Sequence, residues 1–476
     1  MKSIHRAMNI QKPSAKAVGW GKSFLWLIIA VACFHAAYAS IRHPAARLLI
    51  FGYALGLVRL ADQPTVRRAF YFGLATGFLC YAPQLYFIGD LFGPAAIVLW
   101  IVLAFWVGLF TAIVCGAIRR WGRAKVLWLI PAVWTGVEYF RSELYILKFS
   151  WLNIGYALPG YFSGIGPYHL GMYGIGFVVF LVAAAYPYKF LFKMTLLEWI
   201  VVIVILLVLS SLSVVGLREI HSFPGIVGVQ LEFPNANILP KVLNHALAKN
   251  PDAPLFVLSE YTLEGPVPDS LKNWCREHSR FLVVGGEELL GTTNFYDTAF
   301  VVGTNGEIVF QQVKCVPIQF FKDGLPAKEQ KVWNSPWGKI GFCVCYDLSY
   351  TRVTDELVRQ GAQLLIVPTM DVQEWGRHEH ELHARVAPVR AAEYGIPIFR
   401  LASSGISQAV SWDGEVIAQA PFPGSDDIIA AELPLLSKGS VPLDRYLAPV
   451  CVGLTGVLTA VLLFLTWHEK PAGRKN

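Results

Sequence analysis

The sequence predicts a multi-span α-helical membrane domain joined to an α/β domain, and three observations predict this fold class. The chain of 476 residues is 55% hydrophobic and only 15% charged, which is too apolar for an ordinary soluble protein of this length. Apolar residues concentrate in 24–215 and again in 446–467, whereas the stretch between them alternates as globular domains do. That stretch of about 230 residues is long enough to bury a core of its own.

The apolar parts divide into runs of about 20 residues, the length of a helix that crosses a bilayer. We place the predicted spans at 24–40, 46–60, 69–89, 95–117, 126–142, 168–187, 195–214 and 446–467. Lys and Arg gather in alternate connections and near both chain ends, which the positive-inside rule assigns to the cytoplasm. The sequence therefore predicts a membrane domain at 1–216, an extracytoplasmic α/β domain at 217–440, and a last helix with a cytoplasmic tail at 441–476.

Three residues of the middle domain combine the chemistry of a nucleophile, a base and a cation. Glu260, Lys314 and Cys345 each follow a run rich in Val, Ile, Leu and Phe, which is typical of a buried strand. These runs lie at 254–259, 307–313 and 339–344. We expect the Cys345 thiol to face a crevice at the end of its strand, with Glu260 as its base and Lys314 as an oxyanion donor. Cys343 is expected to be a small buried residue.

Nine segments of the middle domain resemble, in order, the nitrilase or carbon-nitrogen hydrolase superfamily. They are 256–260, 296–299, 306–307, 313–314, 341–347, 361–368, 390–395, 400–407 and 412–415. The membrane part is similar, at 134–141, 150–156 and 171–176, to one family of that superfamily, the apolipoprotein N-acyltransferases. This resemblance implies an αββα sandwich on an eight-helix membrane base, with Glu260, Lys314 and Cys345 as a catalytic triad.

The resemblance also implies a reaction in two stages in the inner membrane of a bacterium, on its periplasmic side. Cys345 would take an acyl chain from the sn-1 ester of a phospholipid donor, and the α-amine of a diacylated lipoprotein would then attack the thioester. Lys314 and the backbone N–H of Tyr346 would hold the oxyanion in both stages. The loop with Phe320 and Phe321 could dip into the membrane interface and admit lipid, or its rings could pack on the domain as in an ordinary surface loop.

Three positions depart from the family pattern. The glutamate expected after Lys314 has no clear equivalent, and Gln319, Lys322 and Asp323 are the residues that could compensate for it. Asp347 stands where the family has Glu, as in many soluble amidases, and Ser replaces the proline before the triad glutamate. These departures keep two alternatives open, a membrane-tethered hydrolase and a catalytically silent binding protein. Eight spans are more than tethering requires, which favours the transferase.

The remaining patterns predict no cofactor, no metal site and no nucleic-acid partner. His378, His380 and His383 lack the His-Glu-x-x-His register, so we expect surface or site-wall histidines. No phosphate-binding glycine loop or zinc spacing occurs. The excess of seven Lys and Arg over Asp and Glu lies mostly at helix ends and reflects membrane topology. The eight cysteines show no disulfide framework.

Overall fold

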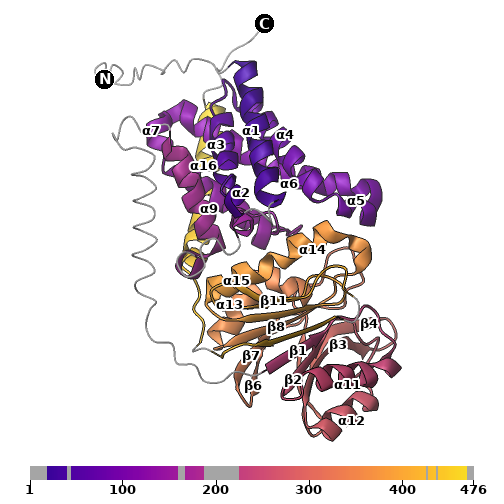
Figure 1. The fold of residues 1–476 in the computed structure, drawn as a ribbon. Helices are drawn as coiled ribbons and strands as arrows, with labels where there is room; N and C mark the ends of the chain where they lie inside the picture. The colour runs from indigo at the N-terminus through magenta and orange to yellow at the C-terminus, as the bar shows by residue number, and fades with distance from the viewer. Residues whose placement is uncertain are drawn as a thin grey trace, which may run out of the picture.

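The computed structural model describes residues 19–39, 44–158, 167–186, 225–424, 427–435 and 438–468. Helices from the N-terminal part and the C-terminal helix α16 (Asp444–His468) form one bundle, and a domain with two sheets lies beside it (Figure 1). The predicted fold class, a helical membrane domain with an αββα sandwich, is confirmed.

The bundle contains helices of very different lengths. They are α1 (Trp20–Ala39), α2 (Pro44–Arg47), α3 (Ile50–Leu60), α4 (Val66–Gln84), α5 (Phe87–Phe92), α6 (Ala96–Trp121), α7 (Arg123–Val126), α8 (Leu129–Tyr139), α9 (Pro167–Ala185) and α16. Among the described residues, three stretches are long and apolar enough to cross a membrane, namely Trp20–Ala39, Phe87–Trp121 and Asp444–His468.

Three predicted spans are interrupted in the structure. The expected span 69–89 contains the end of α4 at Gln84 and the start of α5 at Phe87. The expected span 46–60 is divided into α2 and α3, and the expected span 126–142 contains α8 with only 11 residues, followed by the π-helix Phe140–Leu144. An apolar run keeps the same composition across a helix break, so apolar composition alone does not show where a helix ends. The predicted span 195–214 lies outside the described residues.

Two glycines on α4 explain how closely it packs against α6. A Cβ at Gly73 would lie 2.1 Å from Thr111 Oγ1, and one at Gly77 would lie 2.8 Å from Ala104 Cα. Small residues four apart allow helix backbones to approach in a membrane. Helix α8 packs on both α9 and α16, so the C-terminal helix belongs to the same bundle.

The second domain contains two six-stranded sheets, with orders β12-β1-β2-β3-β4-β5 and β11-β10-β9-β8-β7-β6. The strands of the first sheet are β1 (Gly225–Val229), β2 (Leu255–Leu258), β3 (Phe281–Leu290), β4 (Asn294–Val302), β5 (Ile308–Val313) and β12 (Ile428–Glu432). Those of the second are β6 (Val332–Ser335), β7 (Gly338–Phe342), β8 (Leu364–Thr369), β9 (Ile398–Ala402), β10 (Gln408–Val410) and β11 (Val416–Gln419). The strands β1 to β3 are parallel to one another, as are β7 to β9.

Side chains that alternate along the strands build two packed layers. Leu255 and Val257 of β2 share one core with Phe342 of β7, between the sheets. Phe256 and Leu258, on the other face of β2, pack in a second core beneath two helices, α11 (Leu239–Lys249) and α12 (Asp269–His278). The outer side of the second sheet carries α13 (Thr351–Arg359), α14 (Arg377–Ala384) and α15 (Val386–Tyr394).

Buried ion pairs join the two parts of the molecule. Arg445, at the start of α16, donates from Nη1 to Glu393 Oε1 of α15 at 2.8 Å and from Nε to Asp355 Oδ1 of α13 at 2.9 Å. Glu393 Oε1 also accepts from the backbone N–H of Met172 on α9 at 3.1 Å. Removing one partner of such a buried pair leaves a costly unpaired charge, so these contacts hold the sheet domain against the bundle.

Candidate active site

The structure brings Glu260, Lys314 and Cys345 together at the ends of strands from both sheets. Glu260 follows β2, Lys314 follows β5, and Cys345 begins the 3-10 helix Cys345–Ser349 after β7. Lys314 Nζ donates to Glu260 Oε1 at 2.7 Å. Met370 connects the other two residues, because its N–H donates to Glu260 Oε2 at 2.6 Å and its carbonyl accepts from Cys345 Sγ at 3.9 Å.

Cys345 has a backbone conformation that few residues other than glycine adopt. Its φ is +50°, in the left-handed region, which costs of order 1–3 kcal/mol for such a residue and is found preferentially at functional sites. Cys343, two residues earlier, is fully buried as predicted. All the cysteines among the described residues are free thiols.

Three carboxyl groups surround the Lys314 ammonium. Besides Glu260, they are Asp323, whose Oδ2 lies 2.7 Å from Nζ, and Asp297, whose Oδ2 lies 3.4 Å away. Burial and the charge of Glu260 raise the pKa of Asp297 well above its usual value. Burial also acts to raise the pKa of Glu260, but the Lys314 ammonium and neighbouring hydrogen bonds hold it below its usual value. Glu260 is therefore a carboxylate that can accept a proton.

The structure shows which residue takes the position beside Lys314 where the family pattern has a second glutamate, namely Asp323. Gln319 donates to the carbonyl of Ile146 in the bundle, and the Lys322 ammonium lies 5.8 Å from the centroid of the Phe295 ring. Of the three residues that could compensate for the missing glutamate, Asp323 is the one in contact with the Lys314 ammonium.

The Cys345 thiol is more buried than the sequence suggested. We expected a thiol open to a crevice, but Cys345 is only 2% exposed. Burial and the nearby negative charge of Glu260 raise the pKa of Cys345 well above its usual value. At neutral pH this residue is therefore a protonated thiol.

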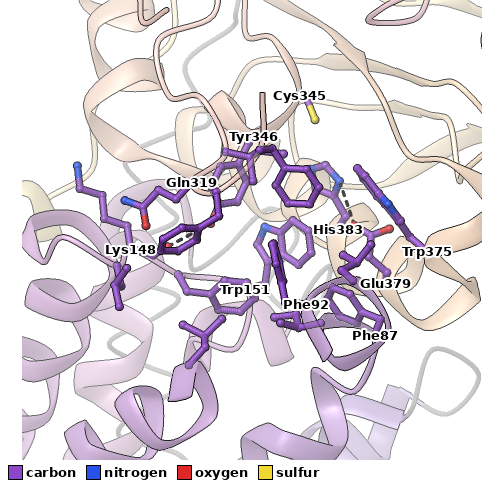
Figure 2. A pocket seen from close by; sticks show the side chains of 18 residues that line it. Phe87, Phe92, Lys148, Trp151, Gln319, Cys345, Tyr346, Trp375, Glu379 and His383 are labelled. Carbon is purple, nitrogen blue, oxygen red and sulfur yellow. Dashed lines mark hydrogen bonds and ion pairs between the residues drawn. The ribbon is translucent and has the colours of Figure 1, made fainter. Parts of the chain in front are cut away.

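A largely apolar cavity of about 850 Å³, counted with its open mouth, reaches Cys345 (Figure 2). The bundle supplies Phe87, Phe92, Lys148 and Trp151 to its wall, and the sheet domain supplies Gln319, Phe320, Phe321, Tyr346, Trp375, Glu379 and His383. Phe320 and Phe321 are 79% and 40% exposed, and their rings contact Phe92 at 6.4 and 5.3 Å between centroids. Both rings thus lie at the mouth of the cavity beside the bundle, and Phe320 stays largely exposed.

Two residues that follow Cys345 connect it to the rest of the site. The Tyr346 hydroxyl donates to the carbonyl of Lys148 at 3.2 Å, which ties the thiol segment to the bundle. The Asp347 carboxylate accepts from the backbone N–H groups of Cys315 at 3.0 Å, Val316 at 2.7 Å and Val344 at 3.3 Å. Burial raises the pKa of Asp347 to about 6, which leaves it ionised at neutral pH. Asp347 thus fixes the segment after Lys314 against the segment before Cys345.

A buried polar cluster in the same wall was not predicted as a unit. Asp371 Oδ1 accepts from His383 Nδ1 at 2.8 Å, and its other oxygen accepts from Arg400. His383 lines the cavity, as a site-wall histidine should, and is stacked on Trp151 at 4.6 Å. Asp371 follows the buried strand β8 directly after Met370, much as Glu260 follows β2. A polar residue directly after a buried strand was the signal that could have found it.

Two groups of acidic and histidine side chains lie close enough to hold a cation. They are Asp371, Glu379 and His380, and Glu260, Asp297 and Asp323. In the first group Asp371 pairs with the Arg400 guanidinium. The second group surrounds the Lys314 ammonium, which already pairs with all three of its carboxyl groups.

Residues 213–442, which contain both sheets and the Glu-Lys-Cys arrangement, match the carbon-nitrogen hydrolase family model, and this match gives the class of the domain. Residues 32–185 match the model of the apolipoprotein N-acyltransferase N-terminal domain. With both domains present in this order, the chain belongs to the apolipoprotein N-acyltransferase family.

Relatives of two kinds are similar to this chain. An apolipoprotein N-acyltransferase of Geobacter metallireducens is 23% identical and aligns with 83% of this chain and 87% of its own length. A deaminated glutathione amidase of Dictyostelium discoideum is 26% identical, and the alignment covers 33% of this chain and 62% of the amidase. Nit3 of Saccharomyces cerevisiae, a nitrilase-superfamily structure, has a TM-score of 0.40 and 21% identity over 45% of this chain and 91% of Nit3.

Proposed function

We propose that this protein is an N-acyltransferase that moves an acyl chain from a phospholipid, through a thioester on Cys345, to the α-amine of a diacylglyceryl-cysteine on a lipoprotein. The observation that carries this proposal is the position of the Cys345 thiol, which lies in an apolar cavity walled on one side by the membrane bundle. A lipid can enter such a cavity with its acyl chain shielded from water. The family membership and the relative that matches most of the chain support the same function.

The first half-reaction forms the thioester. Glu260 takes the thiol proton as Cys345 Sγ attacks the ester carbonyl carbon of the donor. The tetrahedral oxyanion accepts hydrogen bonds from Lys314 and from the backbone N–H of Tyr346. The carbon–oxygen bond then breaks, Glu260 returns its proton to the leaving alkoxide, and a lysophospholipid departs.

The second half-reaction uses the same donors for the oxyanion. The neutral amine of the lipoprotein attacks the thioester carbonyl, a carbon–nitrogen bond forms, and the carbon–sulfur bond breaks. Glu260 takes one amine proton and passes it to the departing Cys345 thiolate. The N-acylated lipoprotein leaves, and the enzyme is ready for another donor.

The alternative function is a membrane-tethered hydrolase. Asp347 and the amidase relative are the features that favour it. The three backbone contacts of Asp347 give this residue a positioning role that suits either reaction. The apolar wall favours the transferase, because a site that discharges a thioester to an amine must keep water away from it.

We place the enzyme in the inner membrane of a bacterium, with the sheet domain on the extracytoplasmic side. The proposed boundaries are 1–216 for the membrane domain, 217–440 for the catalytic domain, and 441–476 for the last helix and its cytoplasmic tail. The long apolar helices support membrane insertion, and the basic residues in the connections support this orientation.

Mass spectrometry of the full-length protein tests the function. The protein is incubated with a defined phospholipid and then with a diacylated lipopeptide, and wild type is compared with Cys345→Ala and with Cys343→Ala. Cys343→Ala removes a thiol two residues away and serves as the matched control. We expect wild type and Cys343→Ala to gain one acyl mass and to lose it to the lipopeptide amine, whereas Cys345→Ala gains none. Discharge to water alone would establish the hydrolase instead.

A further inference from the structure

In the second half-reaction the acceptor nitrogen must lose one proton more than the one that Glu260 transfers to Cys345. The α-amine of a polypeptide has a pKa near 7.7–8.0, so most acceptor molecules arrive at pH 7 as ammonium ions. Forming an amide from an ammonium releases two protons. Glu260 delivers one of them to the Cys345 thiolate, and the other needs a second base close to the thioester.

The cavity wall contains a buried side chain suited to be that base. His383 is 2% exposed and its Nδ1 lies 2.8 Å from Asp371 Oδ1. Since a carboxylate only accepts, Nδ1 carries the proton and Nε2 presents a lone pair. Within the described part of the chain, Nε2 has no hydrogen-bond partner, although it is buried and its ring lines the cavity. Buried polar atoms nearly always have a hydrogen-bond partner, so we expect a ligand to donate a hydrogen bond to Nε2.

A second polar atom without a hydrogen bond lies in the same wall. Glu379 is on α14 with His383, one turn earlier, and its Oε1 lies 3.9 Å from His383 Nδ1. Its other oxygen, Oε2, is buried and, among the described residues, lacks a hydrogen-bond donor. Figure 2 shows Glu379 and His383 in the wall between Trp151 and Trp375. Two buried acceptors in a largely apolar wall match a ligand that carries several N–H donors.

The same wall is close to the reacting sulfur. Asp371, which holds His383, is the next residue after Met370, and Met370 contacts both Cys345 Sγ and the Glu260 carboxylate. The charge of Asp371 is also among the influences that raise the pKa of Cys345. Because Cys345 and His383 line the same cavity, an amine bound at His383 would share that cavity with a thioester on Cys345.

We propose that Glu379 and His383 receive the ammonium group of the acceptor, and that His383, held by Asp371, takes the proton that must leave before the amine attacks. This inference rests on the proposed transferase function. One N–H bond of the ammonium breaks, its proton binds to Nε2, and the freed lone pair forms the bond to the thioester carbon. The imidazolium is stabilised by the Asp371 carboxylate and later releases its proton to solvent as the product leaves.

The electrostatics of the wall agree with this assignment. The charged and titratable groups around the His383 ring are Asp371, Arg400, Glu379 and His380. Burial lowers the pKa of His383, so its imidazole is a neutral base at pH 7. Burial and the charge of Asp371 raise the pKa of Glu379 well above its usual value, and an ammonium ion beside it favours its ionisation. The site thus prefers a cationic acceptor to a neutral one.

Separate measurement of the two half-reactions tests the inference. Full-length enzyme is first acylated with phosphatidylethanolamine in detergent micelles and freed of donor, and the loss of the acyl mass is then followed with a diacylated lipopeptide or with hydroxylamine. The variants are His383→Gln, Glu379→Gln and the matched control His378→Gln. His378 is on the same helix and stacks on Tyr86.

We expect His383→Gln to form the acyl-enzyme within threefold of the wild-type rate and to transfer it to the lipopeptide at least 100-fold more slowly at pH 7, as loss of a general base does. The deficit should shrink below tenfold at pH 9, where the acceptor is already a free amine. Discharge to hydroxylamine, which is neutral at pH 7, should stay within threefold. Glu379→Gln should raise the lipopeptide concentration for half-maximal transfer about tenfold, and His378→Gln should match wild type.

Several results would overturn the inference. Transfer to the lipopeptide within threefold of wild type in His383→Gln would show that another group takes the proton. An equal loss in acylation, lipopeptide transfer and hydroxylamine discharge would show a purely structural role. If His383→Gln does not fold, an unchanged lipopeptide requirement in Glu379→Gln overturns the assignment of the ammonium site. Failure of the proposed function itself is distinguishable, because the wild-type enzyme would then form no acyl-enzyme at all.

Discussion

Replacing Asp323 by Asn should slow thioester formation without removing any triad residue. Both carboxylate oxygens of Asp323 face donors. Oδ1 accepts from Lys314 Nζ and from the Tyr261 hydroxyl, each at 2.9 Å, and Oδ2 accepts from the Ile318 N–H at 2.5 Å and lies 2.7 Å from Lys314 Nζ. An Asn side chain has only one oxygen, so in either orientation its NH₂ group replaces one of these acceptors and faces donors.

The magnitude follows from the contacts that are lost. The better orientation of Asn keeps its oxygen at the Oδ2 position and gives up the charge-assisted bond from Lys314 at Oδ1. A hydrogen bond to a charged group contributes about 1.5–3 kcal/mol, and each 1.36 kcal/mol corresponds to a factor of ten in rate. If Lys314 needs this contact to meet the oxyanion, acylation should slow by about 10- to 150-fold.

The assay is the single-turnover rate of acyl mass gain on Asp323→Asn, with Glu329→Gln as the matched control. Glu329 pairs with Lys331 at 2.6 Å on the surface, where the two side chains are 66% and 60% exposed, and such pairs contribute little. The control should acylate at the wild-type rate. If Asp323→Asn acylated within twofold of wild type, Glu260 and Asp297 alone would suffice to hold Lys314, and the argument for Asp323 would fail.

Three further predictions concern other parts of the site. Gly405→Ala should lower transfer more than tenfold, measured as lipopeptide acylation, because its Cβ would lie 2.8 Å from Asp371 Cβ. Lys148→Met should raise the phospholipid concentration for half-maximal acylation about fivefold, because Lys148 lines the cavity and a lysine near anionic headgroups contributes about 1 kcal/mol. Burial opposes the ionisation of Glu393, but Arg445 lowers the pKa of Glu393 to about 2, against about 4.3 when unfolded. The ionised Glu393 contributes on the order of 3 kcal/mol of stability, which is complete above the unfolded pKa and is lost as pH falls from about 4.3 to 2. Glu393→Gln should therefore have a lower free energy of unfolding than wild type at pH 7, and that free energy should depend less on acid pH. Chemical unfolding at several pH values measures both effects.

The three strands that precede the triad were predictable because each is a short apolar run that ends in a polar residue. The predicted strands 254–259 and 307–313 contain β2 and β5, and the predicted strand 339–344 overlaps β7, which begins at Gly338 and ends at Phe342. Strand ends on facing sheets converge, so the sequence correctly expected Glu260, Lys314 and Cys345 to meet. Their catalytic roles stay predictions until the acyl-enzyme is measured.

The contribution of the bundle to the site could not be predicted from sequence patterns. The sequence pattern does not distinguish Phe92 and Trp151 from other apolar residues of the membrane part. Only the packed structure shows that they line one cavity with Tyr346. The same is true of Asp371 and His383, which are 12 residues apart with a turn and a helix start between them. Local periodicity carries no information on such contacts.

The shared cavity gives a physical reason for a large membrane domain where one helix would suffice as an anchor. Each CH₂ group kept out of water is worth about 0.8 kcal/mol, so exposing even about ten methylenes of a donor chain would cost about 8 kcal/mol. A catalytic domain on a flexible tether would meet that cost each time it drew a chain from the bilayer. Here Phe87 and Phe92 of the bundle and Tyr346 beside the thiol line one continuous apolar wall, and the pairing of Arg445 with Glu393 fixes the two halves of that wall against each other. Under the proposed function, the acyl chain can therefore reach Cys345 while remaining in apolar surroundings, and the same exclusion of water protects the thioester until the amine arrives.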